Sequence, residues 1–579
     1  MHYAYHVLTS DFLLVWTALL ALVVIGGYWW SGEALPSTPT AAGVSGRTPS
    51  FVQRFNLVDL VSIVALLSFV AFYIVMIFYK EDFAYYDDDM LTDFSVAGKS
   101  LMPPIWPGTG RFYPLSDQEF NVLKFFTRSP AGYHALVAIE LVVLLVVLFL
   151  FLREFKVRYR SLLLMAVLVA PGFLVPFTGF VYPERNVLFW LAVMLLCLQG
   201  YANTGRRGYF VGCLVATHFA LYYKETAVLL IVGYAVSQIC LKLYNGRGAP
   251  RHSWQELARE NALSLGILAV STVYVALFFA AMLPHRKFSY IAEHHVALGS
   301  VLFEYLQTDW LPLIMLLFFA VRLGRFLLSR GTLDPLWDPL AVGALAYFFG
   351  IISVRLNSAY YMAPAGLIAL FYLAHLSLPW LARPARASIV AVAFLCIFLH
   401  DAAYSSFRII ERKSLITTKT ELAGFLQGYL TTQKSAKVEL FFPYATGYNL
   451  MELSAYLKYK GFHLDGQSAP GGETGPELVI EGRGQFANNH CVAYNDYDCI
   501  HAEQPDPGAL MVVLPDDDAT DDEVRSVSKN SKELLDEKPP QIVTKEGSWL
   551  RALHVISPEF STKDLPDHWL ELQVFQVKG

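Results

Sequence analysis

Apolar stretches of about 20 residues recur from the N-terminus to about residue 405, and this recurrence constrains the fold more than any other feature. A helix needs about 20 apolar residues to cross the hydrocarbon core of a bilayer, because each residue adds about 1.5 Å. Only 16% of the residues are charged, against about 25% in soluble domains. The chain is therefore predicted to be a polytopic α-helical membrane protein, and its net charge of −5 gives no sign of nucleic-acid binding.

The apolar pattern predicts about twelve membrane-spanning helices. They cover residues 11–30, 57–79, 132–152, 161–180, 187–201, 208–223, 226–243, 261–283, 310–328, 337–354, 358–377 and 387–405. Two of these segments could be broken or tilted: 161–180, which contains Pro171 and Pro176, and the short segment 187–201.

Lys and Arg are concentrated in alternate loops between the predicted helices. One set includes Arg47 and Arg54, the stretch 153–160, and Arg383 and Arg386. Loops rich in Lys and Arg usually face the cytoplasm. The orientation that follows is that of a bacterial inner-membrane protein with its N-terminus, the loop 80–131 and everything after residue 405 on the periplasmic or extracellular side.

The residues after the last apolar stretch are predicted to form a separate extracytoplasmic α/β domain, 406–579, following a transmembrane domain, 1–405. "KVELFFP", "ELVIEG" and "ALMVVLP" have the pattern of strands, and "YNLMELSAYLKYKGF" and "DDEVRSVSKNSKELLDE" have that of helices. Cys491 and Cys499 lie eight residues apart in this tail. A disulfide between them would fit an oxidising compartment.

Three adjacent carboxylates, Asp87, Asp88 and Asp89, follow the second apolar stretch in "FAYYDDDMLTDF". Like charges at this distance raise one another's pKa, and a basic carboxylate suits proton abstraction from a hydroxyl group. Adjacent aspartates could also hold Mg²⁺ or Mn²⁺, which prefer oxygen ligands. The sequence leaves this divalent cation open and indicates no other cofactor.

Several ionisable residues map to the same predicted membrane face as the aspartates. They are Arg111 in "GTGRFYPL", Glu184 and Arg185 in "YPERN", Lys224 and Glu225 in "YYKETA", and Arg355 in "SVRLNS". Cations at helix ends often only extend toward lipid phosphates, and neighbouring opposite charges often form structural ion pairs. Taken as a set, they instead predict a site with a carboxylate base and with cations that hold a departing phosphate.

The region from about residue 83 to 240 resembles the protein O-mannosyltransferase-like branch of the GT-C superfamily of membrane glycosyltransferases. The resemblance rests on an ordered series: "FAYYDDD", "GRFYPL", "TRSPAGYHALVAIELV", "VPFTGFVYPERN" and "YYKETAVLL". These segments are most similar to the group that often carries tetratricopeptide repeats. The chain differs from that group by an extra helix before the acidic loop, by the lack of the repeats and by its C-terminal domain.

The resemblance implies transfer of a monosaccharide from a polyprenyl- or dolichyl-phosphate donor to a hydroxyl acceptor, with inversion at the anomeric carbon. Asp87 or Asp88 would be the general base, and Asp89 is a poorer candidate. Arg111, Arg185, Lys224 and Arg355 are the candidates for binding the donor phosphate. Glu184 and Glu225 would orient those cations or contact sugar hydroxyls, and His134 would lie near the pocket.

Two other classes of function fit the same residues. A transporter or flippase of a lipid-linked glycan would use the cations to hold phosphate, but it should carry charges deep in its helices and a repeated half. A non-catalytic cell-envelope assembly protein would use the C-terminal domain to recruit a partner. The acceptor also stays open among a lipid, a glycan and a protein hydroxyl.

Overall fold

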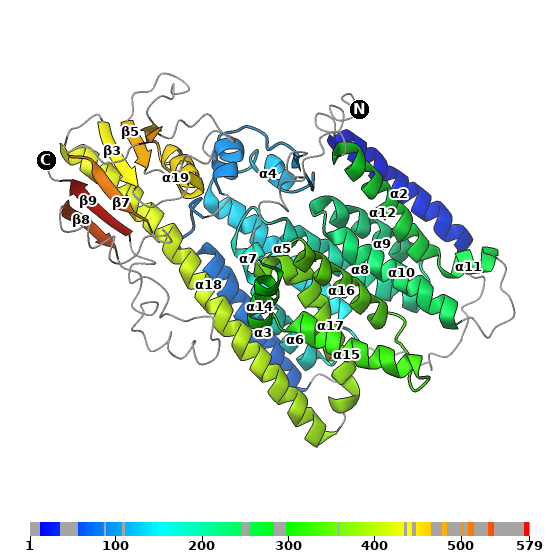
Figure 1. Cartoon of the computed structure of the whole chain (residues 1–579). Coiled ribbons are helices and arrows are strands. Elements are labelled where there is room, and N and C mark those ends of the chain that lie inside the picture. The colour runs from blue at the N-terminus through cyan, green and yellow to red at the C-terminus, as the bar shows by residue number, and fades with distance from the viewer. Residues whose placement is uncertain are drawn as a thin grey trace. The chain divides into compact units, whose positions relative to one another are not determined.

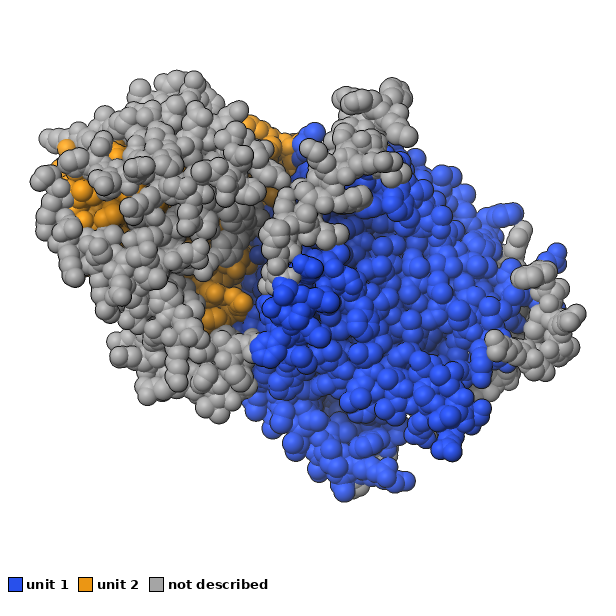
Figure 2. Space-filling model, viewed as in Figure 1, with its two compact units in different colours: residues 1–74, 102–119, 136–405 blue, residues 75–101, 120–135, 406–579 orange. Residues whose placement is uncertain are grey.

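The computed structural model describes most of the apolar part of the chain and the ordered elements of the tail. It describes residues 12–34, 56–85, 88–106, 110–245, 254–282, 297–356, 358–381, 383–433, 437–442, 447–464, 477–482, 500–501, 508–514, 531–537 and 572–577. The chain divides into two compact units, coloured separately in Figure 2. Unit 1 comprises residues 1–74, 102–119 and 136–405, and unit 2 comprises residues 75–101, 120–135 and 406–579.

Unit 1 is built mainly from apolar helices, some of which extend into unit 2. They are α2 (Phe12–Ala34), α3 (Leu57–Phe78), α5 (Pro130–Phe151), α6 (Val157–Val169), α7 (Pro171–Thr178), α8 (Pro183–Thr204), α9 (Arg207–Tyr223), α10 (Ala227–Asn245), α11 (Trp254–Glu260), α12 (Ala262–Met282), α14 (Leu298–Thr308), α15 (Leu311–Leu327), α16 (Trp337–Ser353), η4 (Ala359–Met362), α17 (Ala363–Leu381) and α18 (Pro384–Gln433). Each predicted apolar segment coincides with one of these helices or with a broken pair of them.

Eight helices in the described part of the chain are long and apolar enough to cross a membrane, or up to ten if each bent pair counts as one span. This confirms the predicted fold class, a polytopic helical membrane protein, although the sequence predicts about twelve spans. The difference lies in α9 and α16, whose 17 residues each make them shorter than the helices counted here. In Figure 1, α8, α9 and α10 lie beside one another. The backbones of α10 and α16 approach closely where Gly233 faces Gly343, because a Cβ at Gly233 would lie 2.9 Å from the Cα of Gly343.

Of the two segments expected to be broken or tilted, 187–201 lies within the continuous helix α8, whereas 161–180 is broken at Ala170. Its backbone is extended, with φ −62° and ψ 133°, and α6 and α7 meet there at a bend of 70°. The residue before a proline is disfavoured in helical geometry, so Pro171 ends α6 and begins α7. Gly172 then allows a close approach, since a Cβ there would lie 2.7 Å from the carbonyl oxygen of Ala359.

The last apolar helix does not end near residue 405, where the hydrophobic stretch ends. α18 continues to Gln433, because residues 406–433 contain no proline and carry apolar side chains at helical spacing. Ile416, Ala423, Leu426 and Leu430 are buried in the core of unit 2. The C-terminal segment of α18 is thus amphipathic and packs against the tail.

Unit 2 contains a mixed sheet, and its end of α18 reaches this sheet (Figure 1). Its described strands are β3 (Lys437–Phe442), β4 (His463–Leu464), β5 (Glu477–Gly482), β6 (Ile500–His501), β7 (Leu510–Val513), β8 (Ser531–Glu537) and β9 (Leu572–Val577). The strand order is β4-β5-β3-β7-β9-β8, with β6 beside β5. The pairs of β5 with β3, β4 and β6, and of β3 with β7, are parallel, whereas β9 is antiparallel to both β7 and β8. Helix α19 (Gly447–Tyr459) contributes to the same core, so the tail has the predicted α/β character.

One predicted element of the tail is wrong. The second half of "DDEVRSVSKNSKELLDE" forms strand β8, not a helix. Its backbone pairs with β9, and Leu534 and Leu535 pack against the core of unit 2. Pairing and packing in the sheet therefore override a sequence that favours a helix in isolation. Cys491 and Cys499, the predicted disulfide, lie outside the described residues.

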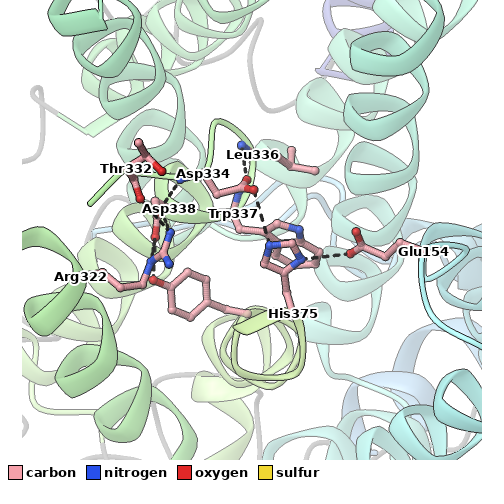
Figure 3. Close-up of polar contacts among 9 residues, drawn as sticks. Glu154, Arg322, Thr332, Asp334, Leu336, Trp337, Asp338 and His375 are labelled. Atoms are coloured by element: carbon pink, nitrogen blue, oxygen red, sulfur yellow. Dashed lines mark hydrogen bonds and ion pairs between the residues drawn. The ribbon is translucent and has the colours of Figure 1, made fainter. Parts of the chain in front are cut away.

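Polar side chains connect the helices of unit 1 where α15 ends and α16 begins (Figure 3). Asp334 caps α16, because its Oδ1 accepts the backbone N–H groups of Leu336 and Trp337, each at 2.8 Å. Asp338, inside the first turn, accepts Nη2 of Arg322 at 2.7 Å and the hydroxyl of Tyr372 at 2.7 Å. These contacts join α15, α16 and α17.

Candidate functional site

Arg111 is positioned in unit 1 by a short hairpin, β1 (Ile105–Trp106) and β2 (Arg111–Phe112). Phe112 is fully buried, and its carbonyl oxygen accepts a hydrogen bond from the Tyr274 hydroxyl at 3.0 Å. The Arg111 Nε lies 2.6 Å from Oε1 of Glu225, and its guanidinium lies 4.7 Å from the ring centre of Tyr113. The "GRFYPL" and "YYKETA" motifs therefore meet, although 114 residues separate the two partners.

Lys224 and Glu184 form a second ion pair, which is almost fully enclosed. The Lys224 Nζ lies 2.8 Å from Oε1 of Glu184, and the two side chains are only 5% and 1% exposed. Lys224 directly follows α9, and Glu184 lies in the first turn of α8, where a carboxylate also interacts favourably with the helix dipole. The rings of Tyr113 and Tyr361 each lie 5.2 Å from the ammonium group. Two aromatic faces and one carboxylate thus fix this cation.

Arg185 is enclosed by acceptors from several elements. Its Nη2 lies 2.9 Å from Oε1 of Glu119, its Nε lies 2.5 Å from Oε2 of Glu140, and its Nη1 donates to the carbonyl of Phe180 at 2.9 Å. Asn186 also donates to Glu119, at 2.8 Å. The Arg185 side chain is 1% exposed. This arrangement suits a structural cation that joins α4 (Gln118–Leu123), α5 and α8 better than one that receives a ligand.

The two ion pairs, Arg111–Glu225 and Lys224–Glu184, are close enough for the charge of one to affect the other. Burial alone would raise the pKa of Glu225, but the neighbouring charges of Arg111 and Lys224 hold it below its ordinary value. Glu225 therefore stays ionised as a partner of Arg111. Arg355 lies just beyond α16, exposed, with a left-handed φ of 60° that is typical of a helix end.

The predicted base, Asp87 or Asp88, belongs to unit 2. Asp87 lies outside the described residues. Asp88 is 1% exposed, and its Oδ2 accepts the backbone N–H of Tyr85 at 2.9 Å. Burial raises its pKa well above the ordinary value, and this rise is opposed by the charge of Arg412 and by the Tyr85 hydrogen bond. Asp88 is therefore a carboxyl group with increased basicity.

Two further predicted residues lie in the same unit. Asp89 is buried, and its carbonyl oxygen accepts the hydroxyl of Thr92 at 3.1 Å. His134 is buried near the start of α5, with its ring edge-on to Phe78 at 6.2 Å. Its surroundings there are those of a packed histidine.

The sequence analysis missed three residues that complete these clusters: Glu119, Glu140 and Arg412. Glu140 carried a signal, because it is the one carboxylate inside the apolar stretch 132–152. Glu119 and Arg412 lie in polar stretches where nothing sets them apart. Within the described residues, no three or more His, Cys, Asp or Glu side chains are grouped so that they could hold a metal ion.

No protein-family model and no curated protein matches the sequence. Among solved structures, the chain is similar to ArnT from Cupriavidus metallidurans, determined with undecaprenyl phosphate bound. The two chains share 14% identity, with a TM-score of 0.37, over 88% of this chain and 98% of that chain. A likeness of this size does not assign the chain to a family, so the residues of the site carry the functional inference.

Proposed function

We propose that the chain is an integral-membrane inverting glycosyltransferase. It would move a monosaccharide from a polyprenyl-phosphate donor to a hydroxyl acceptor on the extracytoplasmic side of the membrane. The observation that carries the proposal is the meeting of three separated motifs at one end of unit 1. Arg111, Glu184, Lys224 and Glu225 come from these motifs and form two neighbouring ion pairs around Tyr113.

The proposed reaction breaks the bond between the anomeric carbon and the phosphate oxygen. The acceptor oxygen attacks the opposite face of the sugar, its proton passes to an aspartate, and polyprenyl phosphate leaves. A sugar or serine hydroxyl is too weak an acid to ionise at neutral pH, so the base contributes roughly 10²–10⁴-fold in rate. Asp87 or Asp88 has this role, and burial makes the Asp88 carboxyl more basic.

The departing phosphate requires cations at fixed positions. Arg111 and Lys224 fit this role because Glu225 and Glu184 hold them in place before any substrate enters. Arg355, an exposed cation beyond α16, is a further candidate for this role. We assign Arg185 a structural role, because two carboxylates and a carbonyl already surround it.

The test is consumption of polyprenyl-phosphate sugars by the purified protein. A panel of these donors would be incubated with it, and release of polyprenyl phosphate measured for the wild type and for Asp87→Asn, Asp88→Asn and Lys224→Met. We expect one aspartate variant to lose at least 100-fold in rate while unfolding at the wild-type temperature. Normal turnover by both aspartate variants, or transport of intact donor into liposomes without turnover, would reject the proposal.

A further inference from the structure

The acidic loop is part of the core of unit 2. Ala84 is buried in the same apolar cluster as side chains from α18, α19 and the sheet. The ring of Phe83 lies edge-on to Tyr459 of α19 at 5.4 Å. The Tyr456 hydroxyl donates to Oδ2 of Asp82 at 2.7 Å. The tail and the end of α18 therefore determine where the loop lies.

Arg412 of α18 contacts the acidic motif directly. Its side chain is buried, and its guanidinium carbon lies 3.9 Å from the ring centre of Tyr85. Tyr85 and Asp88 form two hydrogen bonds, each residue donating one through its backbone N–H. The Tyr85 N–H donates to the Asp88 carboxylate at 2.9 Å, and the Asp88 N–H donates to the Tyr85 carbonyl at 3.1 Å. One cation thus contacts the residue that holds the carboxylate.

The other charged groups that act on Asp88 come from the same two helices. They are Lys413 and Lys419 of α18 and Glu452 of α19. Lys419 pairs with Glu452 at 3.2 Å, so these two charges largely offset each other. Lys413 donates to the carbonyl of Ile77 at 3.0 Å. Burial raises the pKa of Asp88, and the charge of Arg412 opposes this rise more strongly than any other group does.

We propose that Arg412, from the part of α18 that packs on the tail, is a positioning residue for the proposed base, Asp88. The inference rests on the proposed function. Stacking of the guanidinium on Tyr85 fixes the backbone N–H that binds the carboxylate. Its charge lowers the cost of ionising a buried carboxyl group, which must be ionised before it can accept a proton.

The experiment follows the ionisation of Asp88 in two ways. The first is an infrared titration of the purified full-length protein. It follows the carbonyl band of the protonated Asp88 carboxyl, which is identified as the band that is absent in Asp88→Asn. The second is the pH profile of polyprenyl phosphate release. In Arg412→Gln we expect the midpoint of the band and the acidic limb of the profile to move to higher pH by about one unit or more. Arg412→Lys keeps the charge, so its midpoint should stay near the wild-type value.

Arg408→Gln is the matched control, because Arg408 lies one turn away on α18 and is paired with Glu411 at 2.8 Å on a more exposed face. Its midpoint should not move. An unchanged midpoint in Arg412→Gln, or an equal shift in the control, would overturn the inference. If Arg412→Gln does not fold, Arg412→Lys tests the positioning role instead. Turnover that is several-fold slower at an unchanged midpoint would support that role, and full activity would contradict it.

The outcomes separate this inference from the proposed function. If Asp88→Asn stays active while Asp87→Asn does not, the glycosyltransferase proposal stands and the role of Arg412 is rejected. If both aspartate variants turn over normally, the proposed function fails first, whatever the infrared titration shows.

Discussion

Ion pairs at the two ends of the helices in unit 1 differ in how far they are exposed to solvent. At the end where α8 and α10 begin, Lys224 and Glu184 are paired and almost completely enclosed. At the other end, His375 lies between Glu154 and Asp334, 3.5 Å from each, with all three side chains more than a fifth exposed (Figure 3). Enclosed charges lose most of their hydration, whereas exposed charges keep much of it.

This difference separates a candidate site from a structural joint. The more exposed end consists of helix caps and interhelical contacts that stabilise the ends of α15, α16 and α17. Its buried carboxylate, Asp338, is 2% exposed, but it accepts hydrogen bonds from Arg322, Tyr372 and the backbone N–H of Asp334. At the enclosed end the Lys224–Glu184 pair lies almost entirely away from water, and such a buried pair is seldom retained for stability alone. Its residues also come from the ordered motifs. The comparison therefore supports the enclosed end as the site.

The sharpest test of the comparison is Lys224→Met at the enclosed end. It leaves the buried Glu184 carboxylate without its partner, so we expect a loss of about 3–5 kcal/mol in the free energy of unfolding, together with loss of sugar transfer. The double variant Lys224→Met/Glu184→Gln removes both charges. It should regain most of the stability and none of the activity. Thermal unfolding in detergent measures the stability of each variant. If Lys224→Met were as stable as the wild type, the proposed difference between the two ends would be contradicted.

At the exposed end, Arg322→Gln should cost less. Asp338 would lose the guanidinium but keep the Tyr372 hydroxyl and the backbone N–H of Asp334 at 2.5 Å, and water can reach the Arg322 position. We expect a loss of about 1–2 kcal/mol with unchanged turnover. Arg330→Gln, at an exposed position nearby, is the control and should have no effect. Reduced turnover at normal stability would assign this end to the site as well.

The sequence could predict the helices and where most of them begin and end, because both follow from local patterns. Apolar length gives the spans, Pro171 gives the break, and the strands of the tail follow from short β-branched and aromatic stretches. The pairing of charges does not follow from local patterns. Arg185 and Glu119 are 66 residues apart, and Arg111 and Glu225 are 114 residues apart. Only packing of the helices selects these partners.

The tail shows the same limit. Arg412 lies in a polar stretch after the last apolar segment, where a sequence pattern gives no reason to connect it with Tyr85 and Asp88 more than 300 residues earlier. Strand β8 was predicted as a helix because its composition is charged and helix-favouring, and its partner β9 lies beyond it in the chain. In both cases the outcome depends on contacts with residues far away in the sequence.

A smaller effect, and one that depends on pH, is expected for Glu225→Gln. Because the folded-state pKa of Glu225 lies below its ordinary value of 4.5, its ionised form stabilises the protein above that value. This contribution is lost as the pH falls through the folded-state pKa. The variant should be about 1 kcal/mol less stable at neutral pH and equal to the wild type in acid. Unfolding temperatures across this range measure it, and a constant difference would contradict the ionised pair.

The smallest effect is expected for His375 at the exposed end. Its nitrogens are 3.5 Å from two carboxylates that water also reaches, and its ring stacks on Trp337 with the ring centres 5.0 Å apart. Exposed ion pairs contribute about 0–1 kcal/mol, so His375→Gln should cost less than about 1 kcal/mol. His375→Phe keeps a stacked ring and should cost still less. A loss as large as that of Lys224→Met would mean that the two ends do not differ in the way their exposure indicates, and the assignment of the enclosed end as the site would lose its physical basis.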